Sequence, residues 1–298
     1  MTSRLTPSTA ALLLLPPLFW AGNAVVGRAL VGHFPPLALS FWRWALAFAI
    51  LLPFAARSLR AHHDTIRTHW RALVVLSFLG VACYNSLQYL ALQTSGAVNA
   101  TLIGASGPVA GLLIGAAFYQ ARVSHRQWIG AALSAAGVLW VIARGDLANL
   151  LGLRFAMGDL IMLVATVLWS FYTWMLRRQR PPLPMTALLA LQIGLGALMI
   201  LPIYLVELAV TQRVPEATTT NVAALVYVAV LPSIVAYYCW DRGVARAGAV
   251  LPMHFVNLTP VFTALLATFF LAEPIGLFHF VGGALILVGI HLANRPTA

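Results

Sequence analysis

Apolar stretches follow one another along almost the whole chain, separated only by short connections that contain Pro, Gly and Arg. A helix needs about 20 apolar residues to cross the hydrocarbon core of a bilayer. The chain divides into ten such stretches, approximately at residues 8–29, 36–57, 70–91, 96–119, 125–143, 156–176, 185–206, 221–242, 247–271 and 275–293. The connections are too short to hold a soluble domain. The sequence therefore predicts an all-α polytopic membrane protein with ten transmembrane helices.

The composition agrees with this fold class. Of the 298 residues, 61% are hydrophobic and 8% are charged, whereas about 25% of the residues in a typical soluble domain are charged. All of the positive charge behind the net charge of +11 comes from Arg, because the chain contains no Lys. A strong positive charge can indicate nucleic-acid binding, but Arg in cytoplasmic connections is the simpler explanation in a membrane protein. We therefore expect membrane lipid, and no nucleic acid, as a partner.

The arginines are distributed unevenly between the two sides of the predicted membrane. With the N-terminus inside, thirteen of the eighteen lie in cytoplasmic segments. The others are Arg28, Arg144, Arg154 and Arg213 on the opposite side and Arg43 within a helix. Cytoplasmic connections of membrane proteins carry an excess of Arg and Lys. The distribution therefore predicts that both termini are cytoplasmic.

The chain contains an internal repeat. Tyr84–Pro108 resembles Ala236–Pro260, which follows at a constant offset of 152 residues, and the two stretches share Gly, Ala, Val and Pro at matching positions. An offset of 149 residues relates Trp20, Pro35 and Pro53 to Trp169, Pro184 and Pro202. Chance similarity between apolar sequences is the alternative interpretation, and the matched Trp and Pro residues count against it. The repeat divides the chain into residues 1–148 and residues 149–298.

Each half holds five predicted helices, and this number has a consequence for orientation. Because five is odd, the second half must enter the membrane upside down relative to the first. Inverted repeats are typical of secondary transporters. Two related halves around a central cavity can exchange inward-facing and outward-facing states. The sequence therefore predicts transport by alternating access.

Aromatic and amide side chains gather on particular faces of the predicted helices. Trp20 and Asn23 share one face of the first helix, and Trp169 and Tyr172 share the equivalent face of the sixth. We expect these two faces to meet near the membrane midplane. Aromatic walls with a few amides suit a small amphipathic solute, although ordinary helix packing explains them equally simply. The candidate substrate-binding residues of this kind are Trp20, Asn23, Tyr84, Gln88, Trp169, Tyr172 and Tyr237.

Two prolines mark expected breaks in the predicted helices. Pro108 and Pro260 occupy matching positions of the repeat, and each should interrupt the backbone hydrogen bonds of its helix. Broken helices at corresponding points of two halves indicate a transport site. His254 and Asn257 precede the second break and are further candidate substrate-binding residues. A purely structural kink is the alternative for each proline.

Arg43 is a candidate functional residue because it is a charge within a predicted membrane helix. Three roles are open. It can bind a substrate carboxylate, extend to the lipid headgroups, or form an ion pair with Glu273 or Asp159. No acidic residue lies at the centre of a predicted helix, which favours facilitated diffusion over proton coupling.

Enzymatic activity is not expected. The chain has no phosphate-binding loop, no HExxH motif and no paired carboxylates that indicate hydrolysis. Cys83 and Cys239 lie in apolar stretches and do not match in the repeat, so we interpret them as packing residues. We therefore expect no catalytic residue, cofactor or metal. An integral-membrane enzyme acting on lipid-linked substrates is the alternative outside transport.

Three stretches resemble the drug/metabolite transporter superfamily of the EamA type. They are WAGNAVVGRAL from Trp20, FWRWALA around Arg43, and the run from Leu258 to Ile290 that contains Pro260 and Glu273. Within that family the chain is similar to YddG-type bacterial exporters of aromatic and other neutral amino acids. The resemblance implies ten helices, a central cavity, export from the cytoplasm and a place in the bacterial inner membrane.

The first helix departs from one branch of this superfamily. Small four-helix relatives carry a membrane-embedded Glu there, which exchanges drug cations for protons, whereas this chain has Asn23 nearby. We therefore expect a facilitative exporter with an amino acid as substrate and no obligate protein partner. A proton-coupled efflux pump for drug or metabolite cations is the alternative.

Overall fold

The computed structural model describes residues 7–120, 124–151, 156–247, 255 and 258–294. These residues form helices and connections, with no strand among them. The first predicted half contains α1 (Pro7–Ala29), α2 (Pro36–Ala61), α3 (His63–Thr68), α4 (Trp70–Ser77), η1 (Phe78–Cys83), α5 (Tyr84–Ala91), α6 (Ala97–Ala105), α7 (Gly107–Tyr119) and α8 (His125–Ile142). The short helix α9 (Leu147–Leu151) spans the boundary, and the second half contains α10 (Met157–Gln179), α11 (Met185–Thr211), α12 (Thr219–Ala229), η2 (Val230–Val235), α13 (Ala236–Ala247), α15 (Thr259–Leu271) and α16 (Leu277–Asn294).

Six helical segments of the described residues are long and apolar enough to cross a membrane, namely Ser8–Ala29, Pro36–Ala61, Trp70–Ala91, Met157–Leu176, Met185–Thr211 and Thr219–Trp240. The bent pair α6 and α7 makes a seventh if it is counted as one span. The three other predicted stretches correspond to the shorter helices α8, α15 and α16. The chain is therefore all-helical and multi-pass, and the number ten stays a prediction.

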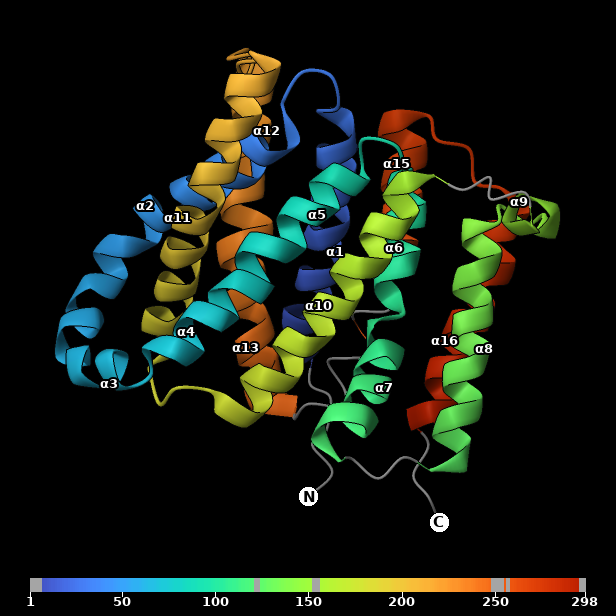
Figure 1. The fold of residues 1–298 in the computed structure, drawn as a ribbon, viewed down its shortest axis with the longest axis horizontal. Coiled ribbons are helices and arrows are strands. Elements are labelled where there is room, and N and C mark those ends of the chain that lie inside the picture. The colour runs from blue at the N-terminus through green and yellow to red at the C-terminus, as the bar shows by residue number, and fades with distance from the viewer. Residues whose placement is uncertain (1–6, 121–123, 152–155, 248–254, 256–257, 295–298) are drawn as a thin grey trace.

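The helices pack as a bundle with two flanking pairs. α2 packs against α11 on one side, α8 packs against α16 on the other, and α1 and α10 lie between these pairs (Figure 1). The main hydrophobic core lies between the central helices and includes Leu92, Ile103 and Met162. This arrangement places the side chains of α1, α5 and α10 inside the bundle.

Glycines allow α8 and α16 to approach closely. A Cβ atom on Gly137 would lie 2.7 Å from the carbonyl oxygen of Gly282, and one on Gly289 would lie 2.5 Å from the carbonyl oxygen of Gly130. Small residues at helix contacts are the usual means of close packing in membranes. The close contact of α8 with α16 therefore depends on Gly137, Gly282 and Gly289.

Segments of unusual helical geometry recur at the repeat offset. The π-helical segments η1 and η2 begin at residues 78 and 230, which are 152 residues apart. The helices α7 and α15 begin at residues 107 and 259 and each end before a left-handed residue, Gln120 and Ala272. In Figure 1, α1 and α10 run in opposite directions, while α1 begins and α16 ends at the same side of the bundle.

The two expected helix breaks coincide with helix starts. α6 and α7 meet at a bend of 41°, and Pro108 lies in the first turn of α7. Pro260 lies in the first turn of α15. Proline is tolerated in a first turn because that turn has no intrahelical acceptor for its missing N–H. Both prolines therefore begin a helix rather than kink the middle of one.

Candidate functional site

Arg43 is the centre of a buried polar cluster. It lies in α2 and is 1% exposed. Its Nη1 atom donates to Asn85 Oδ1 at 2.7 Å, to Tyr89 Oη at 3.0 Å and to Asn23 Oδ1 at 3.1 Å. Its Nε atom donates to Ser233 Oγ at 2.7 Å. The guanidinium group thus joins α1, α2, α5 and η2.

Hydrogen bonds between its neighbours hold the cluster in place. Tyr89 Oη donates to Asn23 Oδ1 at 2.7 Å. Asn23 Nδ2 donates to Gln88 Oε1 at 3.0 Å. Asn23, Gln88 and Tyr89 are all buried, so their polar groups depend on one another instead of on water. The predicted residues Asn23, Arg43 and Gln88 therefore belong to one network.

The π-helical segment η2 supplies two further contacts. Ser233 Oγ donates to the carbonyl oxygen of Val228, five residues earlier, and accepts the bond from Arg43 Nε. The indole Nε1 of Trp20 donates to the carbonyl oxygen of Pro232 at 3.2 Å. A π-helical turn displaces the regular backbone hydrogen bonds and is frequent at functional sites. Here it turns a carbonyl and a hydroxyl group toward α1 and α2.

The positive charge of Arg43 has no carboxylate partner among the described residues. Glu273 pairs with Arg28 instead, at 3.4 Å, and Asp159 accepts a hydrogen bond from Ser95. The expected ion pair of Arg43 with Glu273 or Asp159 is therefore wrong. An extended conformation toward the lipid headgroups is also wrong, because the side chain is almost fully buried. Sequence position gave the depth of Arg43 along its helix but not the direction of its side chain.

One end of the guanidinium group makes no hydrogen bond with the described residues. The hydrogen bonds that Arg43 makes with the described residues involve Nε and Nη1, and none involves Nη2. The ring of Trp44 lies 4.5 Å from Cζ, measured to the ring centroid, and provides a cation–π contact. The site therefore offers a buried cation with free donor capacity.

Aromatic rings form two separate groups around the interior. Trp20 packs edge-on against Tyr237 at a centroid distance of 6.1 Å, and Tyr237 packs against Trp44 at 6.5 Å. Trp169 packs against Tyr84 at 4.7 Å and against Tyr172 at 4.8 Å. We expected the faces of Trp20 and Trp169 to meet, but the described residues show no ring contact between them. The first group adjoins Arg43 through Trp44.

Gln192 is a buried residue that the sequence did not single out. It accepts a hydrogen bond from Tyr172 Oη at 3.0 Å. At the offset of 149 residues, Gln192 corresponds to Arg43 and Tyr172 corresponds to Asn23. The equivalent polar contact therefore exists in both halves, and only the first half places a charge there.

Asn85, Tyr89 and Ser233 also contact Arg43. Asn85 and Tyr89 are four residues apart on one helical face, and each is the sequence neighbour of a predicted residue, Tyr84 or Gln88. Ser233 reaches Arg43 from a π-helical segment for which the sequence has no recognised signal. His254 and Asn257 lie outside the described residues.

Comparison with known proteins gives the family. The model of the EamA-like transporter family matches residues 7–143 and 156–295, which lie in the two predicted halves. An uncharacterized transporter of Archaeoglobus fulgidus is 29% identical over 96% of this chain and 97% of its own length. The uncharacterized transporter YyaM of Bacillus subtilis is 25% identical over 93% of this chain and 90% of its own length.

Two further matches bear on function and fold. A protein of Streptantibioticus cattleyicolor named "Probable terminal-alkyne amino-acid exporter" is 25% identical over 96% of this chain and 93% of its own length. A solved crystal structure is 21% identical, covers 97% of each chain and has a TM-score of 0.66, so it shares the fold. The family match covers most of the chain. This protein is thus a multi-pass membrane transporter that belongs to the EamA-like transporter family.

Proposed function

We propose that this protein exports aromatic and other neutral amino acids from the cytoplasm by facilitative alternating access, and that Arg43 binds the substrate carboxylate. The observation that carries this proposal is the buried guanidinium group without a carboxylate partner among the described residues. A substrate anion is the partner that such a site lacks.

The electrostatics of the buried guanidinium group favour an anionic partner. A buried charge without a counter-ion is strongly unfavourable, and a charge-assisted hydrogen bond from Nη2 to a carboxylate relieves part of that cost. The same positive charge repels a cationic solute, which counts against the alternative of drug-cation efflux. Trp20 and Tyr237 supply an apolar surface beside the charge for a neutral or aromatic side chain. The name of the S. cattleyicolor relative supports the same substrate class.

Alternating access is supported by the relation between the halves. The π-helical segments recur at the offset of 152 residues, and the Arg43–Asn23 contact corresponds to the Gln192–Tyr172 contact. In this proposal the halves are inverted repeats that move against each other. Because the second half has Gln192 where the first has Arg43, the carrier holds one carboxylate site.

A basic pocket supports the proposed direction of transport. It has a volume of about 460 Å³ and lies between α3 and α4 of the first half and the end of α10 in the second. Its lining residues are Thr68, His69, Arg71, Ala72, Arg178, Gln179 and Arg180. A cluster of positive charge raises the local concentration of anionic groups. With the termini in the cytoplasm of a bacterium, this pocket faces the cytoplasmic supply of amino acids.

Transport by purified protein in liposomes tests the proposal. Vesicles are loaded with labelled phenylalanine, threonine or a cationic dye, and efflux is followed without a pH gradient. We expect efflux of the two amino acids and none of the dye. Arg43→Gln gives the first half the amide that the second half has at Gln192, and it should abolish efflux. Arg213→Gln, at an exposed position, is the matched control.

Two results would overturn the proposal. Efflux of the dye alone would replace the amino-acid assignment with cation efflux. Full phenylalanine efflux by Arg43→Gln would remove Arg43 from the binding site and leave the substrate without an assigned partner.

A further inference from the structure

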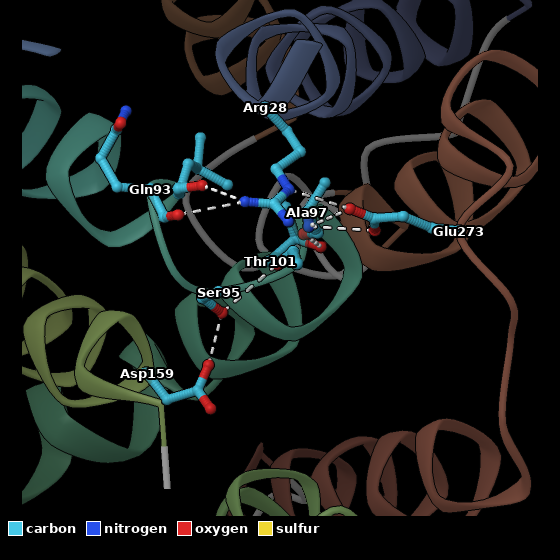
Figure 2. A network of polar contacts seen from close by, with 9 residues as sticks. Arg28, Gln93, Ser95, Ala97, Thr101, Asp159 and Glu273 are labelled. Atoms are coloured by element: carbon cyan, nitrogen blue, oxygen red, sulfur yellow. Dashed lines mark hydrogen bonds and ion pairs between the residues drawn. The ribbon is translucent and has the colours of Figure 1, made fainter. Parts of the chain in front are cut away.

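A second buried cluster lies at the end of the bundle where α10 begins (Figures 1 and 2). Asp159, in the first turn of α10, is completely buried. Its Oδ1 atom accepts a hydrogen bond from Ser95 Oγ. Its Oδ2 atom is also buried and has no hydrogen-bond partner within the described part of the chain. The mechanism proposed above does not use this carboxyl group.

The contact between Asp159 and Ser95 joins the two halves. Ser95 lies in the connection between α5 and α6, two residues before Ala97. The backbone N–H of Ala97 lies 3.2 Å from an oxygen of Glu273, which also pairs with Arg28 (Figure 2). The backbone N–H of Gly158 donates to Thr94 Oγ1 at 2.8 Å. These contacts join α1, α6 and α10 at this end of the bundle, and we take this arrangement as its closed state.

No cation of the described residues forms an ion pair with Asp159. Asn99 of α6 and Arg144, which follows α8, are the other groups near its carboxyl group. Arg144 is exposed to solvent, and the described residues contain no ion pair between Arg144 and Asp159. His279 of α16 contacts Asn99 Oδ1 at 3.0 Å, and Arg28 and Glu273 are engaged with each other. The carboxyl group therefore lacks a counter-ion among the described residues in the closed arrangement.

An ionised carboxylate that is fully buried, with one oxygen unpartnered, is very unfavourable, and such groups take up a proton instead. The neutral form keeps the hydrogen bond from Ser95 and removes the uncompensated charge. We propose that Asp159 is a proton-binding site, occupied when this end of the bundle is closed and vacated to the water on the same side when it opens.

The direction of the pH effect follows from this assignment. The closed state binds one proton more than the open state, so a fall in pH favours closure and a rise favours opening. For one proton, the ratio of closed to open molecules changes by at most about tenfold per pH unit. Since the proton returns to the side from which it came, transport itself stays facilitative. This inference rests on the alternating access proposed above but not on the identity of the substrate.

Infrared spectroscopy of the purified protein in lipid nanodiscs tests the proton directly, without substrate. At neutral pH we expect an absorption band of a protonated carboxyl group that shifts in D₂O and is absent in Asp159→Asn. The matched control Asp146→Asn changes an exposed carboxylate and should keep the band. The same band in wild type and Asp159→Asn would overturn the assignment, as would its absence in wild type.

Distance measurements test the linkage to closure. Spin labels are attached to cysteines introduced at Val214 and Leu277, two exposed positions at this end, after replacement of Cys83 and Cys239 by Ser. In the wild-type background the short-distance population should grow as pH falls, by up to about tenfold in the closed-to-open ratio per pH unit. Asp159→Asn should remain closed at every pH. An equal pH dependence in the variant would overturn the inference.

The two proposals can fail separately. A protein that shows the Asp159 band and pH-linked closure but no amino-acid efflux refutes the substrate assignment alone. A protein that exports phenylalanine with no Asp159 band refutes the proton site alone.

Discussion

Replacement of Arg43 by Met separates a structural role from a binding role. Met has a similar length and no charge, so the variant removes the buried cation and leaves most of the volume filled. In a residue whose interactions are all structural, this change would be strongly destabilising. Arg43 carries a buried charge without a carboxylate partner among the described residues, so we expect the change to cost little stability.

The expected change in the free energy of unfolding follows from the contacts of the Arg43 side chain. Asn85 Oδ1 loses the only hydrogen bond found for it, while Asn23 Oδ1 keeps Tyr89 and Ser233 Oγ keeps Val228. One unsatisfied buried acceptor costs about 1–3 kcal/mol. Removal of a buried ion without a counter-ion regains desolvation free energy of several kcal/mol, which offsets the loss of the hydrogen bonds that Arg43 donates. We therefore expect the folded Arg43→Met protein to be at least as stable as wild type.

Thermal unfolding in detergent, with and without phenylalanine, measures both effects. Without ligand, the midpoint of Arg43→Met should equal or exceed that of wild type. With phenylalanine at a hundred times its dissociation constant, wild type gains about 2.7 kcal/mol and the variant gains none. A large drop in the ligand-free midpoint would refute the reasoning, because it would show that the described contacts already satisfy Arg43.

Three further predictions concern the surroundings of the site and the packing of the bundle. Ser233→Ala removes the acceptor of Arg43 Nε, a bond to a charged group worth about 1.5–3 kcal/mol, so the free energy of unfolding should fall by about that amount, whereas Ser233→Thr keeps the hydroxyl acceptor and should largely retain it. Gly289→Ala places a Cβ atom 2.5 Å from the carbonyl oxygen of Gly130 and should lower the free energy of unfolding by about 1–3 kcal/mol. The control Gly283→Ala, whose Cβ would lie 3.4 Å from Leu102, should have a small effect in the same thermal assay. Arg28→Gln breaks a partly exposed ion pair with Glu273. That ion pair should contribute no more than about 1 kcal/mol to the free energy of unfolding, and its contribution should fall with added salt.

The sequence was sufficient for the features that depend on helical periodicity and on rare residues. The apolar stretches predicted an all-helical membrane protein, and the family match and the apolar helices confirm that class. Asn23 and Gln88, selected as buried amides, contact each other directly. The two prolines lie at helix starts in corresponding positions of the halves.

The contacts between helices could not be predicted in the same way. Periodicity places Arg43 at a depth within α2, but the rotation of α2 relative to α1 and α5 decides whether its partner is Glu273 or Asn85. Ser233 lies within the π-helical segment η2, whose geometry helical periodicity does not predict, and it contacts Arg43 from there. Trp20 and Trp169 likewise pack against rings of the opposite half and not against each other, because α1 contacts α13 and α10 contacts α5.

The most direct test of the carboxylate site compares phenylalanine with phenylalanine amide, which has the same ring and amine but no carboxylate. Binding of both compounds is measured by calorimetry to wild type and to Arg43→Gln. A charge-assisted hydrogen bond worth about 1.5–3 kcal/mol predicts that wild type prefers phenylalanine by at least about tenfold and that Arg43→Gln binds the two compounds equally. An undiminished preference for phenylalanine in Arg43→Gln would contradict the assignment of Arg43 as the residue that binds the substrate carboxylate.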